Sequence, residues 1–301
     1  MKKKYSINRK GEAMKKMNYS KERLLTRLTS TVVLTVFLLM GSSVNADIDN
    51  DKPILIIGAS YENGVTPIDD NLFGPFYGAA VNYGSYLSLG DALVRNDQLN
   101  GFVINEARGG ASVYYREYCG PDSCGFGSWQ GYDVQFQKAL SRVVIRDPQN
   151  PMNILGYNAD YLIMGTPTND CLHAGGVEEP QLVSDQCTTE ELNHVIDGYI
   201  NIAQQAVAIG ITPIVAIYPD YNDINWQVFQ TAFALPWVIN ESTYNELKGL
   251  FHSRLQVEVP EVLLVEAWDQ FKPIGDGLHP DFDSSTNAAK KIVKAMKEHI
   301  K

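Results

Sequence analysis

The chain has 301 residues, of which 45% are hydrophobic and 20% are charged, and its formal net charge at pH 7 is −10. This length and apolar fraction are enough to bury a sizeable core. An acidic surface repels nucleic acid phosphates and anionic lipid headgroups, so we expect neither of them as a partner.

The first 46 residues follow the three-part pattern of a secretory signal peptide. A basic stretch over residues 1–27 precedes a short apolar run at residues 31–40, and small residues follow up to Ala46. The apolar run is far below the roughly 20 residues that cross a bilayer, so we expect no stable membrane anchor. We predict cleavage after Ala46 and a secreted or periplasmic protein. This leader holds ten of the 25 Lys and Arg and two of the 35 Asp and Glu, which leaves a net charge of −18.

All four cysteines, Cys119, Cys124, Cys171 and Cys187, follow the leader. In an exported protein an even number of cysteines predicts disulfides, and four cysteines allow three pairings. We favour Cys119 with Cys124 and Cys171 with Cys187, because each pair would close a loop between predicted elements. A zinc site is the weaker alternative, since the spacing of Cys119 and Cys124 is wider than that of a usual zinc knuckle. We expect no metal and no other cofactor.

Five short apolar runs are predicted to form strands. Residues 53–57 are apolar without alternation, which is typical of a strand buried on both faces of a parallel sheet. The other runs lie at residues 101–105, 160–165, 212–218 and 262–266. Helical patterns alternate with them, at residues 85–95, 132–146, 188–210, 242–256 and 284–301. The alternation predicts one α/β domain over residues 47–301, with a parallel sheet and right-handed crossovers.

The helix over residues 188–210 has the strongest boundary signals. Thr188 and Glu191 have the spacing of a capping box, and apolar residues recur at helical intervals up to Gly210. Residues 61–83 are crowded with Gly, Pro, Asn and Asp and are predicted to be a loop. Residues 226–237 are predicted to be an irregular aromatic region.

Turns with reactive side chains follow four of the predicted strands. Gly58-Ala59-Ser60 ends the first strand, Gly109-Gly110 follows the second, Asn169-Asp170 follows the third, and Asp276-Gly-Leu-His279-Pro280 follows the fifth. Parallel strands open their carboxyl ends at one edge of a sheet, so we expect these turns to meet. Together they hold a hydroxyl nucleophile, an imidazole base, a carboxylate and donors for an oxyanion, the groups that acyl transfer needs.

This ordered set of turns resembles that of the SGNH (GDSL-type) hydrolases, from residue 53 to the end of the chain. Secreted lysophospholipase and thioesterase members are similar in having a short strand, here Val103–Asn105, that leads to the glycine turn. The resemblance implies a flavodoxin-like three-layer α/β/α sandwich with a five-stranded parallel sheet.

The resemblance also implies roles for five residues. Ser60 would be the nucleophile, His279 the base, and Asp276 the carboxylate that holds the imidazole. The oxyanion hole would consist of the backbone N–H groups of Ser60 and Gly110 and the side-chain amide of Asn169.

Two features depart from the family pattern. The family usually has Asp at the position of Ala59, and its Gly-x-Asn-Asp turn is lengthened here to Gly165-Thr-Pro-Thr-Asn169. The Gly-x-Ser-x-Gly elbow of the α/β-hydrolase fold is absent, because Glu62 stands at its second glycine.

Several residues have alternative roles. His173 is a rival base, Asp281 and Asp283 are rivals of Asp276, and Asn169 has the alternative of capping a loop. A further group is assigned either to an acyl pocket or to core packing: Phe229, Phe233, Leu235 and Trp237.

The sequence thus predicts an exported serine esterase or lipase-type hydrolase that cleaves carboxylic esters through an acyl-enzyme on Ser60. Its substrate would be a small-molecule, lipid or carbohydrate ester. One alternative is an acyltransferase or carbohydrate deacetylase on the same fold, and another is a catalytically inactive binding protein. The sequence carries no signal for the oligomeric state.

Overall fold

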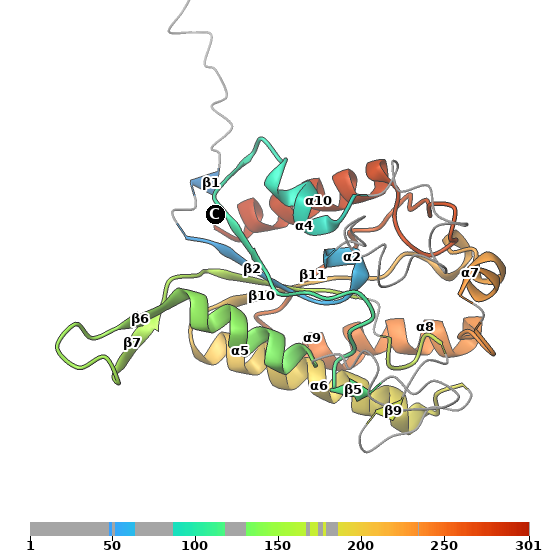
Figure 1. Ribbon diagram of the computed structural model, residues 1–301, viewed down its shortest axis with the longest axis horizontal. Coiled ribbons are helices and arrows are strands. Elements are labelled where there is room, and N and C mark those ends of the chain that lie inside the picture. Colours follow the sequence, from blue (N-terminus) through green and yellow to red (C-terminus); the bar gives the residue numbers. More distant parts are fainter. Residues whose placement is uncertain are drawn as a thin grey trace, which may run out of the picture. The chain divides into compact units, whose positions relative to one another are not determined.

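A five-stranded parallel sheet forms the centre of the computed structural model (Figure 1). Its strand order is β11-β10-β8-β2-β4, and each strand runs parallel to its neighbours. The strands are β2 (Ile54–Ile57), β4 (Val103–Asn105), β8 (Tyr161–Met164), β10 (Thr212–Ala216) and β11 (Leu263–Val265). All five predicted strands are therefore confirmed, and the first of them, β2, lies second from one edge of the sheet, as in flavodoxin-like folds.

The structure describes residues 48–49, 52–63, 87–117, 131–166, 169–173, 177–178, 186–233 and 235–300. The predicted signal peptide and the predicted pair of Cys119 and Cys124 lie outside these residues. No helix in the described part of the chain is both long enough and apolar enough to span a bilayer.

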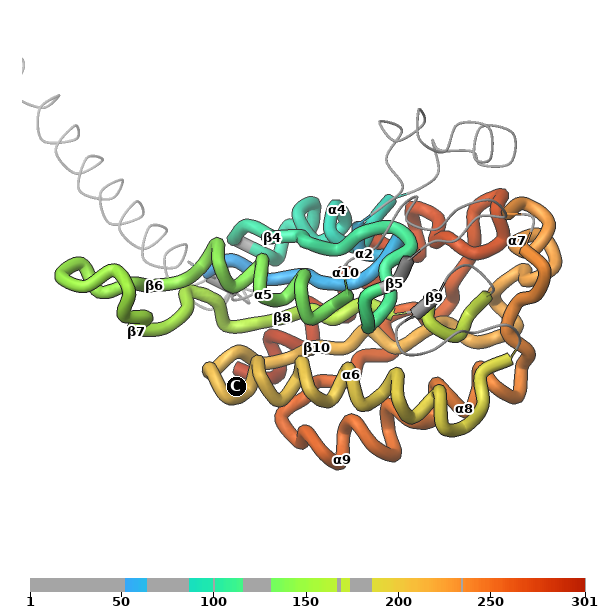
Figure 2. The backbone as a smooth tube through the Cα atoms, turned by 60° about the horizontal axis from the view of Figure 1, so that its bottom comes forward, coloured from blue at the N-terminus to red at the C-terminus, as the bar shows by residue number. Residues whose placement is uncertain are grey.

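Helices cover both faces of the sheet and give three layers (Figures 1 and 2). On one face α4 (Leu89–Val94) packs against the long C-terminal helix α10 (Phe282–His299). On the other face α5 (Tyr132–Val143) and α6 (Thr189–Ala208) contact β2 and β10, and α8 (Glu241–Leu250) packs on α6. The predicted α/β/α sandwich is therefore confirmed.

Helix α6 begins with the predicted capping box. The Thr188 side chain accepts a hydrogen bond from the Glu191 N–H, and the Glu191 carboxylate accepts one from the Thr188 N–H. Two of the otherwise unpaired N–H groups of the first turn are satisfied in this way. The prediction for this helix is confirmed at both ends, which lie within two residues of those expected.

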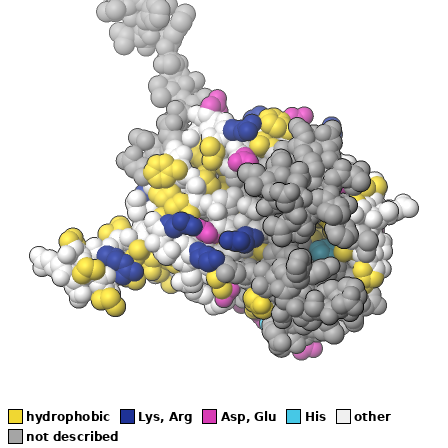
Figure 3. All heavy atoms as spheres, in the orientation of Figure 1, with side chains coloured by type: hydrophobic (Ala, Val, Ile, Leu, Met, Phe, Trp, Pro, Cys, Tyr) yellow, Lys and Arg dark blue, Asp and Glu magenta, His cyan; other side chains and the backbone are white. Residues whose placement is uncertain are grey.

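The helix predicted over residues 132–146 ends earlier, because α5 stops at Val143. The next residues form an antiparallel hairpin of β6 (Val144–Arg146) and β7 (Ile154–Tyr157). Val144 and Ile145 are β-branched, and Pro148 disfavours a helical conformation at the residue before it, so a helix cannot continue here. The hairpin projects from the body of the molecule and exposes the apolar side chains of Ile145, Met152, Ile154 and Leu155 (Figures 1 and 3).

Two further predictions of secondary structure were wrong in part. The aromatic region contains a helix, α7 (Trp226–Ala232), whose first turn is capped by the Asn225 side chain. The helix predicted over residues 242–256 is divided into α8, a π-helical segment η4 (Phe251–Leu255) and α9 (Gln256–Glu258). The apolar residues Tyr244, Leu247, Phe251 and Leu255 are buried along α8 and η4, which explains the apolar pattern.

Short elements complete the described fold. The 3-10 helix η3 (Tyr221–Asp223) precedes α7. The strand β1 (Ile48–Asp49) pairs with β3 (Leu99–Asn100), and β5 (Arg116–Glu117) pairs with β9 (Val177–Glu178). Residues 60–63, at the start of the predicted loop, form the short helix α2 (Ser60–Asn63), and residues 64–83 lie outside the described residues.

Candidate active site

The nucleophile turn, Gly58-Ala59-Ser60, leads from β2 into α2. Gly58 has a φ of +150°, a conformation that L side chains rarely adopt, and this explains a glycine at the end of the strand. Ser60 follows the last residue of β2 by three positions and therefore lies at the carboxyl edge of the sheet. Ser60 is 9% exposed there, at the boundary between the core and the surface.

The acid–histidine turn, residues 276–280, follows β11 and is closed by its own carboxylate. Asp276 Oδ1 accepts hydrogen bonds of 3.0 Å from the N–H groups of Leu278 and His279. Its other oxygen, Oδ2, lies 2.5 Å from His279 Nδ1. This contact fixes the imidazole with Nδ1 toward the carboxylate and Nε2 on the opposite side of the ring.

The ionised form of Asp276 is favoured in this turn. Both side chains are buried, with Asp276 1% and His279 4% exposed. Burial alone would raise the pKa of Asp276, but the facing His279 imidazole and the hydrogen bonds outweigh it and lower that pKa below its ordinary value. The carboxylate can therefore stabilise positive charge on the imidazole.

Tyr61 joins the nucleophile turn to the acid–histidine turn. Its hydroxyl donates a 2.7 Å hydrogen bond to the Leu278 carbonyl, and its ring centroid is 6.2 Å from that of His279. Tyr61 directly follows Ser60, so the predicted nucleophile and the predicted base belong to turns that touch. The prediction that these two turns meet at one edge of the sheet is therefore confirmed.

The glycine turn, residues 108–111, lies beside Ser60. A Cβ added to Gly109 would be 4.0 Å from the Ser60 Cβ, and the Arg108 N–H donates a 3.1 Å hydrogen bond to the Gly58 carbonyl. Gly110 has a φ of +80°, which favours glycine at this position of the turn. The turn thus places Gly109 beside the nucleophile.

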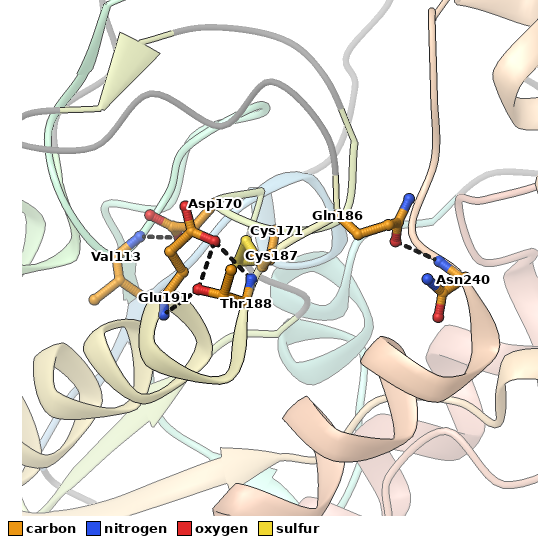
Figure 4. Close-up of a disulfide and its surroundings, with 8 residues drawn as sticks. All are labelled: Val113, Asp170, Cys171, Gln186, Cys187, Thr188, Glu191 and Asn240. Carbon is orange, nitrogen blue, oxygen red and sulfur yellow. Dashed lines mark hydrogen bonds between the residues drawn. A yellow bond between two sulfur atoms is a disulfide. The ribbon is translucent and has the colours of Figure 1, made fainter.

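Asn169 reaches the same glycine turn from the end of β8. Its side-chain nitrogen donates a 2.7 Å hydrogen bond to the Ala111 carbonyl, and the side chain is buried. The next residue, Asp170, accepts a 2.8 Å hydrogen bond from the Val113 N–H (Figure 4). Asn169 therefore contacts the residue that follows Gly110.

A disulfide anchors this asparagine-bearing loop to the start of α6 (Figure 4). It joins Cys171 to Cys187, which precedes the capping residue Thr188. The predicted pairing of these two cysteines is confirmed. No group of three or more His, Cys, Asp and Glu that could hold a metal ion occurs among the described residues.

Aromatic side chains line the imidazole on the side of α7. The ring of Phe233 lies 6.3 Å from that of His279, while Phe229 is buried and contacts Phe233. His173, the rival base, packs against Phe229 with 5.6 Å between the ring centroids. Phe233 is thus beside the site, and Phe229 is part of the core.

Sequence reasoning missed two buried polar side chains that contact the nucleophile turn, Gln135 and Glu62. Gln135 Oε1 accepts a 2.8 Å hydrogen bond from the Gly58 N–H, and its Nε2 donates one of 3.1 Å to the Gly58 carbonyl. Glu62 Oε2 accepts a 3.0 Å hydrogen bond from the Ala59 N–H. Gln135 lies at an apolar-face position of α5, and a polar residue at such a position was the available signal.

No protein-family model matches the chain, and no curated protein matches it either. One solved structure superposes with a TM-score of 0.51 at 14% identity, over 83% of this chain and 98% of that one. A carbohydrate acetylesterase family member from Sinorhizobium meliloti is 14% identical, with a TM-score of 0.48 over 82% of this chain and 98% of that chain. A GDSL-like lipase from Bacteroides thetaiotaomicron is 11% identical, with a TM-score of 0.43 over 88% and 97% of the two chains.

At these identities the likeness concerns the fold alone. Together with the order of the five parallel strands, the superposition at a TM-score of 0.51 shows a flavodoxin-like three-layer α/β/α fold. The fold prediction is confirmed, and the chemistry has to be argued from the side chains of this chain.

Proposed function

We propose that the chain is an exported serine hydrolase that cleaves carboxylic esters through an acyl-enzyme on Ser60. The observation that carries the proposal is the 2.5 Å contact between His279 Nδ1 and Asp276 Oδ2, on a turn that Tyr61 ties to the nucleophile turn. A buried carboxylate that holds an imidazole beside a serine is the arrangement that activates a hydroxyl for acyl transfer.

In this mechanism Ser60 Oγ attacks the ester carbonyl carbon while His279 Nε2 takes the hydroxyl proton. Asp276 remains ionised and stabilises the imidazolium, in agreement with its lowered pKa. The tetrahedral intermediate collapses when the C–O bond to the alcohol breaks and the alcohol receives the proton from His279. Water then attacks the acyl carbon while the same imidazole takes its proton. The bond from that carbon to Ser60 Oγ breaks, Oγ regains the proton from His279, and the carboxylic acid is released.

The oxyanion of both tetrahedral intermediates would be held by the backbone N–H groups of Ser60 and Gly110 and by the Asn169 amide. A carboxamide nitrogen carries two N–H groups, so a donor to the Ala111 carbonyl can also donate to an oxyanion. Loss of one such donor typically costs roughly 10²–10³ in rate. The contact between the glycine turn and the nucleophile turn supports this assignment.

Replacement of the nucleophile tests the proposal. We expect Ser60→Ala to lower kcat for short aryl esters by on the order of 10⁴-fold or more, with the thermal unfolding midpoint unchanged. Ser141→Ala is the matched control, because Ser141 is an exposed serine on α5, and it should retain full activity. Labelling by an alkyl fluorophosphonate should occur in the wild type and not in Ser60→Ala. Full ester hydrolysis by Ser60→Ala would refute the assignment.

The products of the reaction distinguish the proposed esterase from its alternatives. A panel of aryl esters of increasing acyl length and of acetylated sugars, with and without an added alcohol acceptor, distinguishes ester hydrolysis, deacetylation and acyl transfer by their products. A folded protein that neither turns over the panel nor reacts with the fluorophosphonate would be a binding protein.

A further inference from the structure

The middle residue of the nucleophile turn is Ala59, whose side chain can make no hydrogen bond. The backbone of the nucleophile turn is held instead from beneath, by two buried side chains from different elements. The Gln135 carboxamide on α5 pairs with both the N–H and the carbonyl of Gly58, as a neighbouring strand would. The Glu62 carboxyl on α2 accepts the N–H of Ala59.

Both side chains are enclosed, with Gln135 1% and Glu62 0% exposed. The Glu62 carboxyl lies between two glycines, because a Cβ on Gly58 would come within 2.5 Å of Oε2 and a Cβ on Gly165 would overlap the carboxyl group. Tyr199 donates a hydrogen bond to the Gly165 carbonyl and so fixes the backbone of Gly165 beside the Glu62 carboxyl. Glycines at both positions thus leave room for this one side chain.

The chemical state of Glu62 follows from this enclosure. Burial raises the pKa of Glu62 to about 8, so the group is a neutral carboxylic acid at pH 7. Its Oε1 has no hydrogen-bond partner among the residues that the structure describes. The phenols of Tyr132 and Tyr199 lie close enough to interact with it: burial raises their pKa values most, and the charges of Glu62, Asp170 and Tyr218 raise them further.

We propose that Gln135 and Glu62 are positioning residues that together hold Ser60 Oγ in its reactive orientation. This inference rests on the proposed serine chemistry. Gln135 would fix the backbone of Gly58, and Glu62 would fix that of Ala59. These two residues directly precede Ser60 and so set the position of its side chain. Neither side chain touches the substrate.

The Gln135 contacts are tested by kinetics. Gln135→Leu removes both hydrogen bonds to Gly58, and we expect kcat for an aryl ester to fall by roughly 10²-fold with KM changed less than about threefold, because a small misplacement of a reacting atom has an effect of this size. Gln137→Leu, on the exposed side of the same helix, is the matched control and should keep the wild-type kcat. Near-ultraviolet circular dichroism establishes that each variant is folded.

Glu62 is tested by a pH profile, which also covers the case in which Gln135→Leu does not fold. Glu62→Gln keeps an acceptor for the Ala59 N–H and cannot ionise, so it should retain kcat at pH 7 within about threefold. In the wild type kcat/KM should fall as the pH rises through about 8, because an ionised Glu62 would oppose the negative oxyanion nearby. Glu62→Gln should lose this fall.

The outcomes distinguish a failure of the serine chemistry from a failure of the positioning roles of Gln135 and Glu62. A wild type that hydrolyses no ester and does not react with the fluorophosphonate overturns the serine chemistry and, with it, the positioning role. An active wild type with an unchanged kcat in folded Gln135→Leu overturns the role of Gln135. An alkaline fall that persists in Glu62→Gln overturns the role of Glu62.

Discussion

Gly277 illustrates how a single residue sets the geometry of the acid–histidine turn. It has a φ of +81°, and a Cβ at this position would come within 2.5 Å of the Asn225 carbonyl oxygen. The Gly277 carbonyl in turn accepts a 2.8 Å hydrogen bond from the Asn225 N–H. The turn can therefore fold back and present His279 to Asp276 because position 277 has no side chain. The same contact joins the turn to the start of α7.

Glu62 makes the stability of the protein depend on pH. The pKa is raised from 4.5 to about 8 by burial, so the folded state keeps a proton that the unfolded state loses. Stability is therefore full below about pH 4.5 and falls as the pH rises toward 8, by on the order of 1.4 kcal/mol per pH unit. We expect Glu62→Gln to remove this slope.

Urea unfolding at about pH 5 and at about pH 7.5 measures this effect. The free energy of unfolding of Glu62→Gln minus that of the wild type should be larger at about pH 7.5 than at about pH 5. Glu261→Gln, a substitution of an exposed glutamate, should show the wild-type slope. Equal slopes in Glu62→Gln and the wild type would contradict the assignment of a neutral, buried carboxyl.

The residues of the candidate site were predictable where local sequence encodes their chemistry. Asp276 and His279 stand three positions apart in one turn, and their contact is local. Gln135 and Gly58 are 77 positions apart, and their pairing depends on how α5 crosses β2. No periodicity records that crossing, so this hydrogen-bonded pair was not predicted from the sequence.

At the scale of elements, the disulfide holds the loop that carries Asn169 against α6. Cys171 and Cys187 are separated by 16 positions, and a closed loop of this length constrains the unfolded chain by about 3 kcal/mol. We expect the double variant Cys171→Ser/Cys187→Ser to lose about 2–4 kcal/mol in the free energy of unfolding. Because Cys171 is two residues from Asn169, kcat should fall as well.

Urea unfolding and ester hydrolysis of the double variant test this expectation. The variant leaves Cys119 and Cys124 unchanged, so any change in the free energy of unfolding comes from the loss of the bond between Cys171 and Cys187. Thr188→Ala is a control for the helix start, because it removes the cap of α6 and keeps the disulfide; it should cost about 1 kcal/mol without lowering kcat. An unchanged midpoint in the double variant would contradict the prediction.

Strands were predicted better than helix ends, for a physical reason. A strand buried on both faces needs a continuous apolar run, and the short run at residues 54–57 is typical of such a strand. The end of α5 is decided by competition between helix and hairpin at Val144, where the side chains of the hairpin are partly or fully exposed and burial therefore gives no sequence signal. Helix α7 has no charged residue in its seven positions, so its amphipathic pattern is weak, and the Asn225 cap was its main signal.

At the scale of the whole molecule, the proposed export predicts that residues 1–46 are removed. We expect the exported protein to begin at Asp47, since the small residues before it match a signal-peptidase site. Intact-mass measurement of protein recovered outside the cytoplasm of a bacterial host checks this. Ala46→Phe should block processing and leave the longer precursor, and a mature chain that begins well before residue 46 would contradict the assignment.

The hydrogen bond from Tyr61 to Leu278 has a consequence for how the protein acquires its activity. It joins residues 217 positions apart, and the strands that carry the two turns, β2 and β11, are separated in the sheet by β8 and β10. Contacts between such distant parts of a chain are non-local, and folds rich in them form slowly. Since β8 and β10 lie between the two strands, we expect activity recovered on refolding to report completion of the sheet rather than collapse.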